Sequence, residues 1–246
     1  MSVLKTLIIN PRSGVKPTAT LFFMHGLGDS SAGWSDVAQM LSQRPSLSHV
    51  RFVLPNAPIQ PVTLNMGMPM PSWFDSRSSY SFLALDDLSG AEDEAGLLKS
   101  TDEIKKLIKA ENDGSAQGLD GHQIPSERIV VGGFSQGGAI ALLTGLTNPN
   151  AVAGVAALST WLPLRAKIAA LRAPTSKNLK VFQAHGDADQ VVKYEYGQRT
   201  VSFLKNDLGL AKEDVEFRTY PRMPHSACPE EIRDLAAFLE KAIPAQ

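Results

Sequence analysis

A single serine stands among four glycines in the stretch GGFSQGG, residues 132–138. Its inner five residues match the pattern G-x-S-x-G, in which a strand turns sharply into a helix and presents the serine at the turn. The apolar stretch RIVV precedes the motif and the small-residue stretch AIALLTGL follows it, which is the context that such a turn requires. We therefore predict that Ser135 is a nucleophile in a strained backbone conformation, with an ordinary glycine-rich turn as the alternative.

A serine hydroxyl is a weak nucleophile unless a base activates it and an acidic group orients the base. In folds with this motif, the acid and then the histidine follow the serine along the chain. The stretch HGDADQVV offers Asp187 and Asp189 after an apolar run. We favour Asp189 because the spacing H-G-x-x-D-x-x-V is typical of the acid, and Asp187 is the alternative. His225, in the loop before the last predicted helix, is the predicted base, with a purely structural histidine as the alternative.

Other groups compete with this assignment. The remaining histidines are His25, His49, His122 and His185. We expect the first and the last of them to brace loops, and the other two lie in polar segments without a suitably placed acid. Cys228 lies three residues after His225 and could form a Cys-His pair. Because the serine motif already provides a nucleophile, we expect an uninvolved thiol.

Acyl transfer also requires hydrogen-bond donors for the negative oxygen that develops in the transition state. The backbone N–H of Gln136, directly after the serine, is one predicted donor. The glycine loop HGLGDS supplies the other, which we assign to the N–H of Leu27. A phosphate-binding loop is the alternative, but no lysine follows at Walker spacing and no G-x-G-x-x-G is present.

Composition sets wider limits. The chain has 246 residues, of which 43% are hydrophobic and 20% charged, and a formal net charge of −1. We expect a single domain over residues 1–246 and no nucleic-acid partner. With one cysteine, no internal disulfide can form, and a reducing compartment is favoured. No apolar run approaches the roughly 20 residues of a membrane span. We expect a cytoplasmic protein, with the nucleus as a second location, and no stable membrane anchor, metal or cofactor.

The elements around these residues alternate between strands and helices. Apolar runs predict strands at residues 19–26, 50–58, 128–134, 152–159, 179–186 and 215–221. Helical spacing predicts helices at residues 35–43, 94–111, 137–146, 195–209 and 228–242. Strands that are apolar on both faces and separated by helices indicate a mostly parallel sheet covered on both sides. Two segments lack this rhythm: the Pro- and Met-rich residues 59–90, and the polar residues 112–123, which we interpret as a surface insertion.

Beyond the generic serine motif, several stretches resemble the acyl-protein thioesterases, within the phospholipase/carboxylesterase group of α/β-hydrolases. The matching stretches are HGLGDS, PNAPIQPVTLNMGMPMPSWFD, IPSERIVVGGFSQGGAIAL, VAGVAALSTWLPLR, HGDADQVV and MPHSAC, in the order found in that family. The resemblance implies an α/β-hydrolase fold with Ser135, Asp189 and His225 as the catalytic triad and Leu27 and Gln136 as the oxyanion hole. Residues 76–87 and 112–123 depart from the family pattern.

The resemblance further implies cleavage of S-palmitoyl groups from protein cysteines, with lysophospholipids and small esters as further substrates. The irregular segment would then form part of an acyl-binding groove, to which Met is well suited. The predicted groove residues are Leu64, Met66, Met68, Met70, Trp73 and Trp161. Ordinary packing is the alternative for each of them. The resemblance also implies a tendency to form a weak homodimer. The alternative functions are a general carboxylesterase or lysophospholipase and a non-catalytic ligand-binding module of the same fold.

Overall fold

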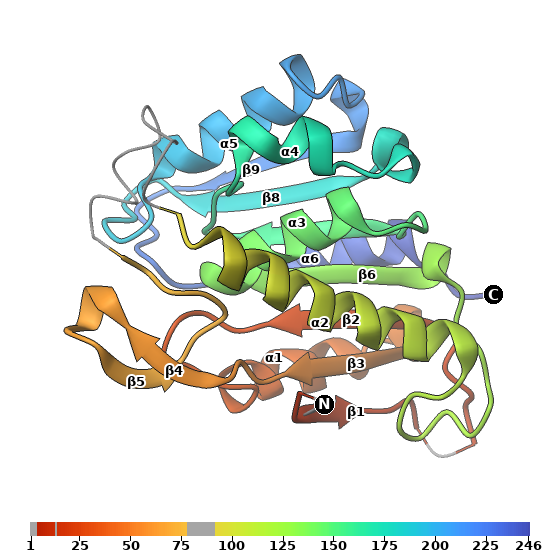
Figure 1. Cartoon of the computed structure of the whole chain (residues 1–246). Helices are drawn as coiled ribbons and strands as arrows, with labels where there is room; N and C mark the ends of the chain where they lie inside the picture. Colours follow the sequence, from red (N-terminus) through yellow and green to blue (C-terminus); the bar gives the residue numbers. More distant parts are fainter. Residues whose placement is uncertain (1–3, 13, 78–91) are drawn as a thin grey trace.

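The computed structural model describes residues 4–12, 14–77 and 92–246. Its centre is a seven-stranded sheet in the order β1-β3-β2-β6-β7-β8-β9 (Figure 1). The strands are β1 (Thr6–Ile9), β2 (Ala19–Met24), β3 (Val50–Pro55), β6 (Ile129–Phe134), β7 (Gly154–Leu158), β8 (Val181–Gly186) and β9 (Val215–Tyr220). β1 pairs antiparallel with β3, and every other neighbouring pair is parallel. The predicted α/β-hydrolase fold with a mostly parallel sheet is confirmed.

Helices cover both faces of this sheet (Figure 1). They are α1 (Ala32–Ser42), α2 (Glu94–Asp113), α3 (Gln136–Thr147), α4 (Arg165–Leu171), α5 (Tyr194–Asn206) and α6 (Pro229–Ala242). Apolar side chains of α2, α3, α4 and α5 pack into one buried cluster, and those of α1 and α6 pack into the other. β2, β3, β7 and β8 are buried along their whole length and β6 in all but its last residue, which is why apolar residues occur on both faces of these strands.

Every strand and helix predicted from periodicity is present, but four strands and helices of the described residues were not predicted. β1 and α4 are short, with four and seven residues. In the segment taken as irregular, β4 (Ile59–Val62) and β5 (Met68–Pro71) form an antiparallel hairpin around a short 3₁₀ turn, Thr63–Asn65. Prolines in both strands and the lack of apolar–polar alternation concealed this hairpin.

The insertion predicted at residues 112–123 also has different bounds, because α2 extends to Asp113 and the irregular part begins only at Gly114. This part is not wholly on the surface. Leu119 is buried, and His122 Nε2 lies 2.7 Å from the backbone oxygen of Pro17. The insertion therefore packs back onto the residues before β2. Of the 59–90 segment, residues 78–90 lie outside the described residues, as does most of the 76–87 stretch.

The parallel topology brings the predicted site residues to one edge of the sheet. Leu27 follows the carboxyl end of β2, and Ser135 follows that of the neighbouring strand β6. Asp189 and His225 follow the neighbouring strands β8 and β9 in the same way. In parallel α/β sheets this edge is where ligands bind.

Candidate active site

Ser135 lies at the tight turn between β6 and α3. Its backbone angles are φ 55° and ψ −121°, a conformation that costs a non-glycine residue free energy. Two hydrogen bonds hold this conformation: the Ser135 N–H donates to the Leu158 oxygen at 2.9 Å, and the Thr160 hydroxyl donates to the Ser135 oxygen at 2.6 Å. The neighbouring strand β7 and its following residues thus fix the serine in the conformation that the motif predicts.

The glycines of the motif allow backbones to meet at distances that side chains would prevent. A Cβ on Gly137 would lie 2.2 Å from the backbone oxygen of Met24, and one on Gly133 would lie 2.4 Å from the Gly137 carbonyl carbon. On the opposite side, a Cβ on Gly26 would lie 3.4 Å from Ser135 Cβ. The loop after β2 therefore packs directly against the serine.

Asp189 and His225 form a close pair. Asp189 Oδ2 lies 2.7 Å from His225 Nδ1, and Asp189 Oδ1 accepts hydrogen bonds from the N–H groups of Val191 and Val192, both at 2.9 Å. Burial opposes ionisation of this carboxyl, but hydrogen bonds from His185 and His225 outweigh it and hold its pKa below the ordinary range. Asp189 is therefore a buried carboxylate that orients the imidazole of His225.

The other acid candidate is placed differently. Asp187 is exposed, and its Oδ1 accepts a hydrogen bond from the Arg222 N–H at 2.5 Å. Arg222 has φ 60°, so Asp187 stabilises a left-handed turn in the loop that carries His225. The geometry therefore favours Asp189 as the acid and gives Asp187 a bracing role.

His225 lies on the loop between β9 and α6, with 16% of its side chain exposed. Its ring packs against that of Phe134 with centroids 4.6 Å apart, which places His225 beside the residue that precedes the serine. Since Nδ1 faces Asp189, Nε2 is the nitrogen available to Ser135. The hydrogen bonds found among the described residues do not include a bond from Ser135 Oγ to this nitrogen, and such bonds often form only once substrate is bound.

The Leu27 and Gln136 backbone N–H groups are available as donors. Gln136 is the first residue of α3, where N–H groups have no partner within the helix. Within the described part of the chain, neither N–H donates to a protein acceptor. The positive end of the helix dipole at α3 adds to the attraction for an anion.

His25 and His185 both brace loops, as expected. His25 is buried, and its ring contacts the Gly26 oxygen and the Ala57 N–H. Burial lowers the pKa of His25, so this ring stays neutral near pH 7. His185 Nε2 lies 2.7 Å from the Val192 oxygen and 3.5 Å from Asp189 Oδ2. Sequence reasoning assigned His185 to the acid loop but did not predict that it approaches the carboxylate itself.

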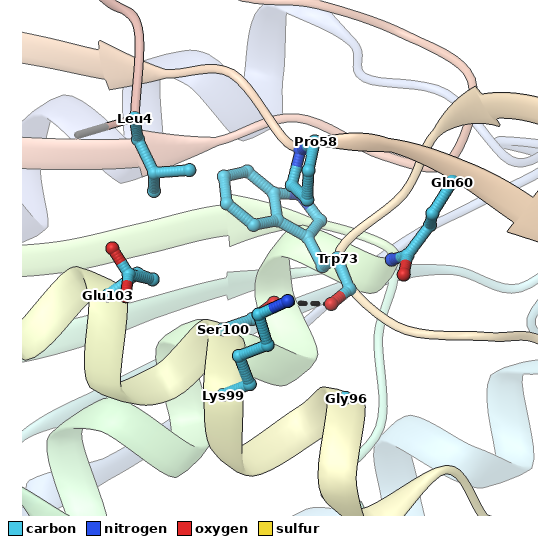
Figure 2. A pocket seen from close by; sticks show the side chains of 8 residues that line it. All are labelled: Leu4, Pro58, Gln60, Trp73, Gly96, Lys99, Ser100 and Glu103. Atoms are coloured by element: carbon cyan, nitrogen blue, oxygen red, sulfur yellow. Dashed lines mark hydrogen bonds between the residues drawn. The ribbon is translucent and has the colours of Figure 1, made fainter. Parts of the chain in front are cut away.

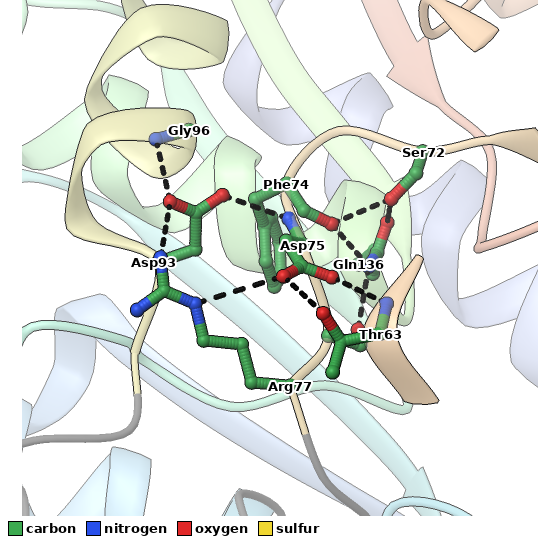
Figure 3. Close-up of polar contacts among 9 residues, drawn as sticks. Thr63, Ser72, Phe74, Asp75, Arg77, Asp93, Gly96 and Gln136 are labelled. Carbon is green, nitrogen blue, oxygen red and sulfur yellow. Dashed lines mark hydrogen bonds and ion pairs between the residues drawn. The ribbon is translucent and has the colours of Figure 1, made fainter. Parts of the chain in front are cut away.

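The side chain of Gln136 has a role that the sequence did not predict. It is buried, and its amide forms hydrogen bonds with residues 72–76, about sixty positions earlier in the chain (Figure 3). The motif draws attention only to the backbone N–H of this residue. The one signal for this role in the sequence was a polar glutamine flanked by small residues.

The predicted groove residues fall into two groups. Leu64, Met66, Met68 and Met70 lie on the β4–β5 hairpin, where Leu64 and Met68 are exposed and Met66 is 89% exposed. Met70 is half-buried, and its Sδ lies 3.8 Å from where a Cβ on Gly28 would be. The hairpin thus lies beside residues 26–28, the loop that carries the Leu27 N–H and is called the oxyanion loop below. It presents apolar side chains to solvent.

The two tryptophans are buried instead. Trp73 is 1% exposed, and its indole N–H donates to the His25 oxygen at 2.8 Å. One side of its ring borders a pocket of about 260 Å³ between β4 and α2 (Figure 2), and Ser135 is not among the residues that line this pocket. Trp161 is buried with its ring edge-on to Phe74, 6.1 Å between centroids. Trp73 therefore belongs to the core behind the site rather than to an open groove, which differs from the role expected.

Two further observations concern the part of the chain that the structure describes. No group of three or more His, Cys, Asp or Glu side chains is arranged there to hold a metal ion. None of the helices in residues 4–12, 14–77 and 92–246 is both long and apolar enough to span a membrane.

Comparison with known proteins places this geometry in context. The family model described as Phospholipase/Carboxylesterase matches residues 5–243. The chain is 89% identical to Acyl-protein thioesterase 1 of Mycosarcoma maydis over 246 residues, which is 100% of both chains. It is 45% identical to Acyl-protein thioesterase 1 of Cryptococcus neoformans var. neoformans, with 98% of each chain covered.

Solved structures give the same result. Acyl-protein thioesterase 2 of Zea mays has a TM-score of 0.76 and 28% identity, covering 97% of this chain and 99% of the other. SOBER1 of Arabidopsis thaliana has a TM-score of 0.78 and 29% identity, covering 92% and 99%. Sequence and fold therefore agree on one group of relatives.

Proposed function

The chain belongs to the phospholipase/carboxylesterase family, and from this premise we propose that it is an acyl-protein thioesterase that removes long-chain acyl groups from protein cysteines. The observation that carries this proposal is the 89% identity to an acyl-protein thioesterase over the full length of both chains. At this identity, and with Ser135, Asp189 and His225 at the same sheet edge, one chemistry is expected for both proteins.

In the proposed acylation step, His225 Nε2 takes the proton of the Ser135 hydroxyl while Oγ attacks the thioester carbonyl carbon. The carbonyl oxygen becomes an oxyanion that accepts hydrogen bonds from the Leu27 and Gln136 N–H groups. As the tetrahedral intermediate collapses, the C–S bond breaks and His225 protonates the leaving cysteine sulfur. Asp189 stabilises the imidazolium throughout without itself taking the proton.

In the proposed deacylation step, water occupies the position left by the thiol. His225 Nε2 removes a proton from this water, and the resulting hydroxide attacks the acyl carbon. The second tetrahedral intermediate uses the same two N–H donors, and its collapse returns the proton to Ser135 and releases a fatty acid. Apart from the substrate and the attacking water, the groups that take part in both proposed half-reactions are side chains and backbone groups of this chain.

The acyl chain of the substrate requires an apolar surface beside Ser135. The β4–β5 hairpin supports this part of the proposal, because its exposed Leu64, Met66 and Met68 continue along the chain to residues that contact the oxyanion loop. Flexible methionine side chains adapt to chains of different shape. We propose that the hairpin contacts the acyl chain while Ser135 holds its carbonyl carbon.

A general carboxylesterase or lysophospholipase is the second candidate, favoured by the description of the matching family model. Thioesters and oxyesters pass through the same kind of tetrahedral oxyanion, so the triad does not separate them. Values of kcat/KM for an S-palmitoylated peptide, lysophosphatidylcholine and a short aryl ester decide between the two. Under our proposal the palmitoylated peptide has the highest value, and a higher value for either ester would replace it.

The nucleophile is tested with a fluorophosphonate probe. We expect wild-type protein to be labelled on Ser135 and Ser135→Ala to remain folded but unlabelled and inactive. Labelling of Ser135→Ala to the wild-type extent would disprove the assignment. Tight binding of a lipid without hydrolysis of any of the three substrates would favour a non-catalytic module. Cytoplasmic location, activity on lysophospholipids and a weak homodimer stay predictions.

A further inference from the structure

Both proposed oxyanion donors are connected to one short segment, residues 71–76. On the side of β2, the Gly28 N–H donates to the Pro71 oxygen at 2.8 Å, and Gly28 directly follows Leu27. A second contact is made two residues before Leu27, where the Trp73 indole N–H donates to the His25 oxygen at 2.8 Å. The loop that carries the Leu27 N–H is thus held at both ends by this segment.

The same segment holds the other donor residue through the side chain of Gln136. Gln136 Oε1 accepts from the Trp73 backbone N–H at 3.1 Å, with the Ser72 hydroxyl 3.2 Å away. Gln136 Nε2 donates to the Phe74 oxygen at 3.1 Å and the Ser76 hydroxyl at 2.9 Å. A primary amide offers two donors and one oxygen acceptor, and all are used here (Figure 3). The amide therefore has a single orientation in the core.

Trp73 is well suited to position the loop after β2, because contacts on several sides hold Trp73 itself in place. Its side chain is almost fully buried, and its backbone oxygen accepts a hydrogen bond from the Ser100 hydroxyl on α2. Its ring also packs against that of His25, with centroids 5.3 Å apart. Trp73 thus links α2, through its backbone oxygen, to His25, through its indole.

The segment also anchors the apolar hairpin. Asp75 accepts hydrogen bonds from the backbone N–H and the hydroxyl of Thr63, both at 2.7 Å, at the tip of the hairpin. Asp93, which caps α2, accepts from the Asp75 N–H at 2.8 Å (Figure 3). The hairpin, the start of α2, the start of α3 and the loop after β2 therefore meet at residues 71–76.

We infer that residues 71–76 set the separation of the two oxyanion donors, with the Gln136 side chain and Trp73 as the positioning residues. This inference rests on the proposed function, because it assumes that the Leu27 and Gln136 N–H groups stabilise an oxyanion. Donors of this kind accelerate a reaction only when they are already fixed at the position that the oxyanion will occupy. Neither positioning side chain touches the substrate.

Two substitutions test the connection through the Gln136 side chain and the connection through Trp73 separately. Gln136→Met keeps the length of the side chain and the backbone N–H but removes the amide. Trp73→Phe keeps an aromatic ring but removes the indole N–H that reaches His25. Because a displacement of about 1 Å at a reacting centre costs roughly 100-fold in rate, we expect kcat to fall about 10- to 100-fold in each variant. The rate of fluorophosphonate labelling of Ser135 falls by a similar factor.

The pattern of kinetic changes distinguishes positioning from acyl binding. In Gln136→Met and Trp73→Phe, kcat falls alike for short and long acyl thioesters, and KM changes by less than about 3-fold. The pH profile of kcat/KM keeps its wild-type shape, because Asp189 and His225 are untouched. Met66→Ala on the exposed hairpin has the opposite pattern, with KM raised for long acyl chains only.

A control separates positioning from loss of stability. Ile168 is fully buried on α4, and its aliphatic side chain forms none of the hydrogen bonds to residues 71–76, so Ile168→Ala weakens the core packing and leaves those bonds in place. Rates are normalised to titrated active sites, and Ile168→Ala should keep the wild-type kcat. The inference is overturned if both test variants keep kcat within about 2-fold of wild type, or if Ile168→Ala loses kcat equally. If wild-type Ser135 itself is not labelled, the proposed function fails instead.

Discussion

The carboxylate of Asp189 divides its two oxygens between different tasks. Oδ2 lies 2.7 Å from His225 Nδ1, and Oδ1 is held by the N–H groups of Val191 and Val192 at 2.9 Å. The backbone contacts fix the carboxylate, so its other oxygen has one direction in which to hold the imidazole. Replacing this carboxylate alone therefore tests the orientation of His225.

Asp189→Asn should abolish most activity without unfolding the protein. An amide at this position can donate to Nδ1, which stabilises the wrong tautomer, and we expect kcat to fall by about 10⁴-fold. Asp187→Asn is the matched control, because its amide oxygen can still accept from the Arg222 N–H, and kcat should stay near the wild-type value. Steady-state kinetics on one thioester suffice. If Asp187→Asn is the more damaging change, the acid has been misassigned.

Stability should depend on pH through Glu231, in the first turn of α6. Glu231 is buried, and burial followed by the nearby Asp234 charge raises its pKa to about 8. The folded state then binds a proton that the unfolded state has lost between about pH 4.5 and 8. The free energy of unfolding therefore decreases as pH rises through this window, by at most about 1.4 kcal/mol per pH unit.

Glu231→Gln should remove this pH dependence, because an amide does not ionise. We expect the variant to match wild type near pH 4.5 and to be the more stable protein at pH 8, measured by urea denaturation at each pH. Glu230→Gln is the neighbouring control: Glu230 is exposed and paired with Arg233, so the slope between these pH values should remain. Equal slopes in wild type and Glu231→Gln would contradict this prediction.

Close backbone contact at the serine turn should make Gly137 irreplaceable. Its Cβ would lie 2.2 Å from the Met24 oxygen and 2.6 Å from the His25 oxygen, and neither backbone can move without shifting β2. We expect Gly137→Ala to cost about 4 kcal/mol or more, or to prevent folding. Gly209→Ala is the comparison, since Gly209 has φ 67° but open space around it, and should cost only about 1–2 kcal/mol. Similar losses of unfolding free energy in both variants would refute the steric argument.

Local patterns predicted most of the scaffold. β6 and β8 were evident because strands buried on both faces need continuous apolar runs, and the G-x-S-x-G pattern identifies a turn such as that at Ser135. The hairpin was missed because Pro61 and Pro69 interrupt both strands, and because a two-stranded edge sheet has no buried face to impose alternation. Hydrogen-bond partners far apart in the chain, such as Gln136 and Phe74, leave no local pattern at all.

The backbone of Ser135 should carry strain that glycine relieves. At φ 55° and ψ −121°, any residue with a Cβ is strained, whereas glycine adopts such angles readily. Ser135→Ala removes the hydroxyl but keeps the Cβ, and Ser135→Gly removes both. We therefore expect Ser135→Gly to be the more stable of the two by about 1 kcal/mol, although both are inactive.

The sign of this difference is the informative result, because glycine normally destabilises a folded chain relative to alanine. Ser176 provides the control: it is buried in the 3₁₀ turn Pro174–Asn178 and is not among the described residues with positive φ. There, Ser176→Gly should be less stable than Ser176→Ala in the same urea titration. If glycine is also the less stable residue at position 135, the serine turn is not strained, and the catalytic hydroxyl is presented without a conformational cost.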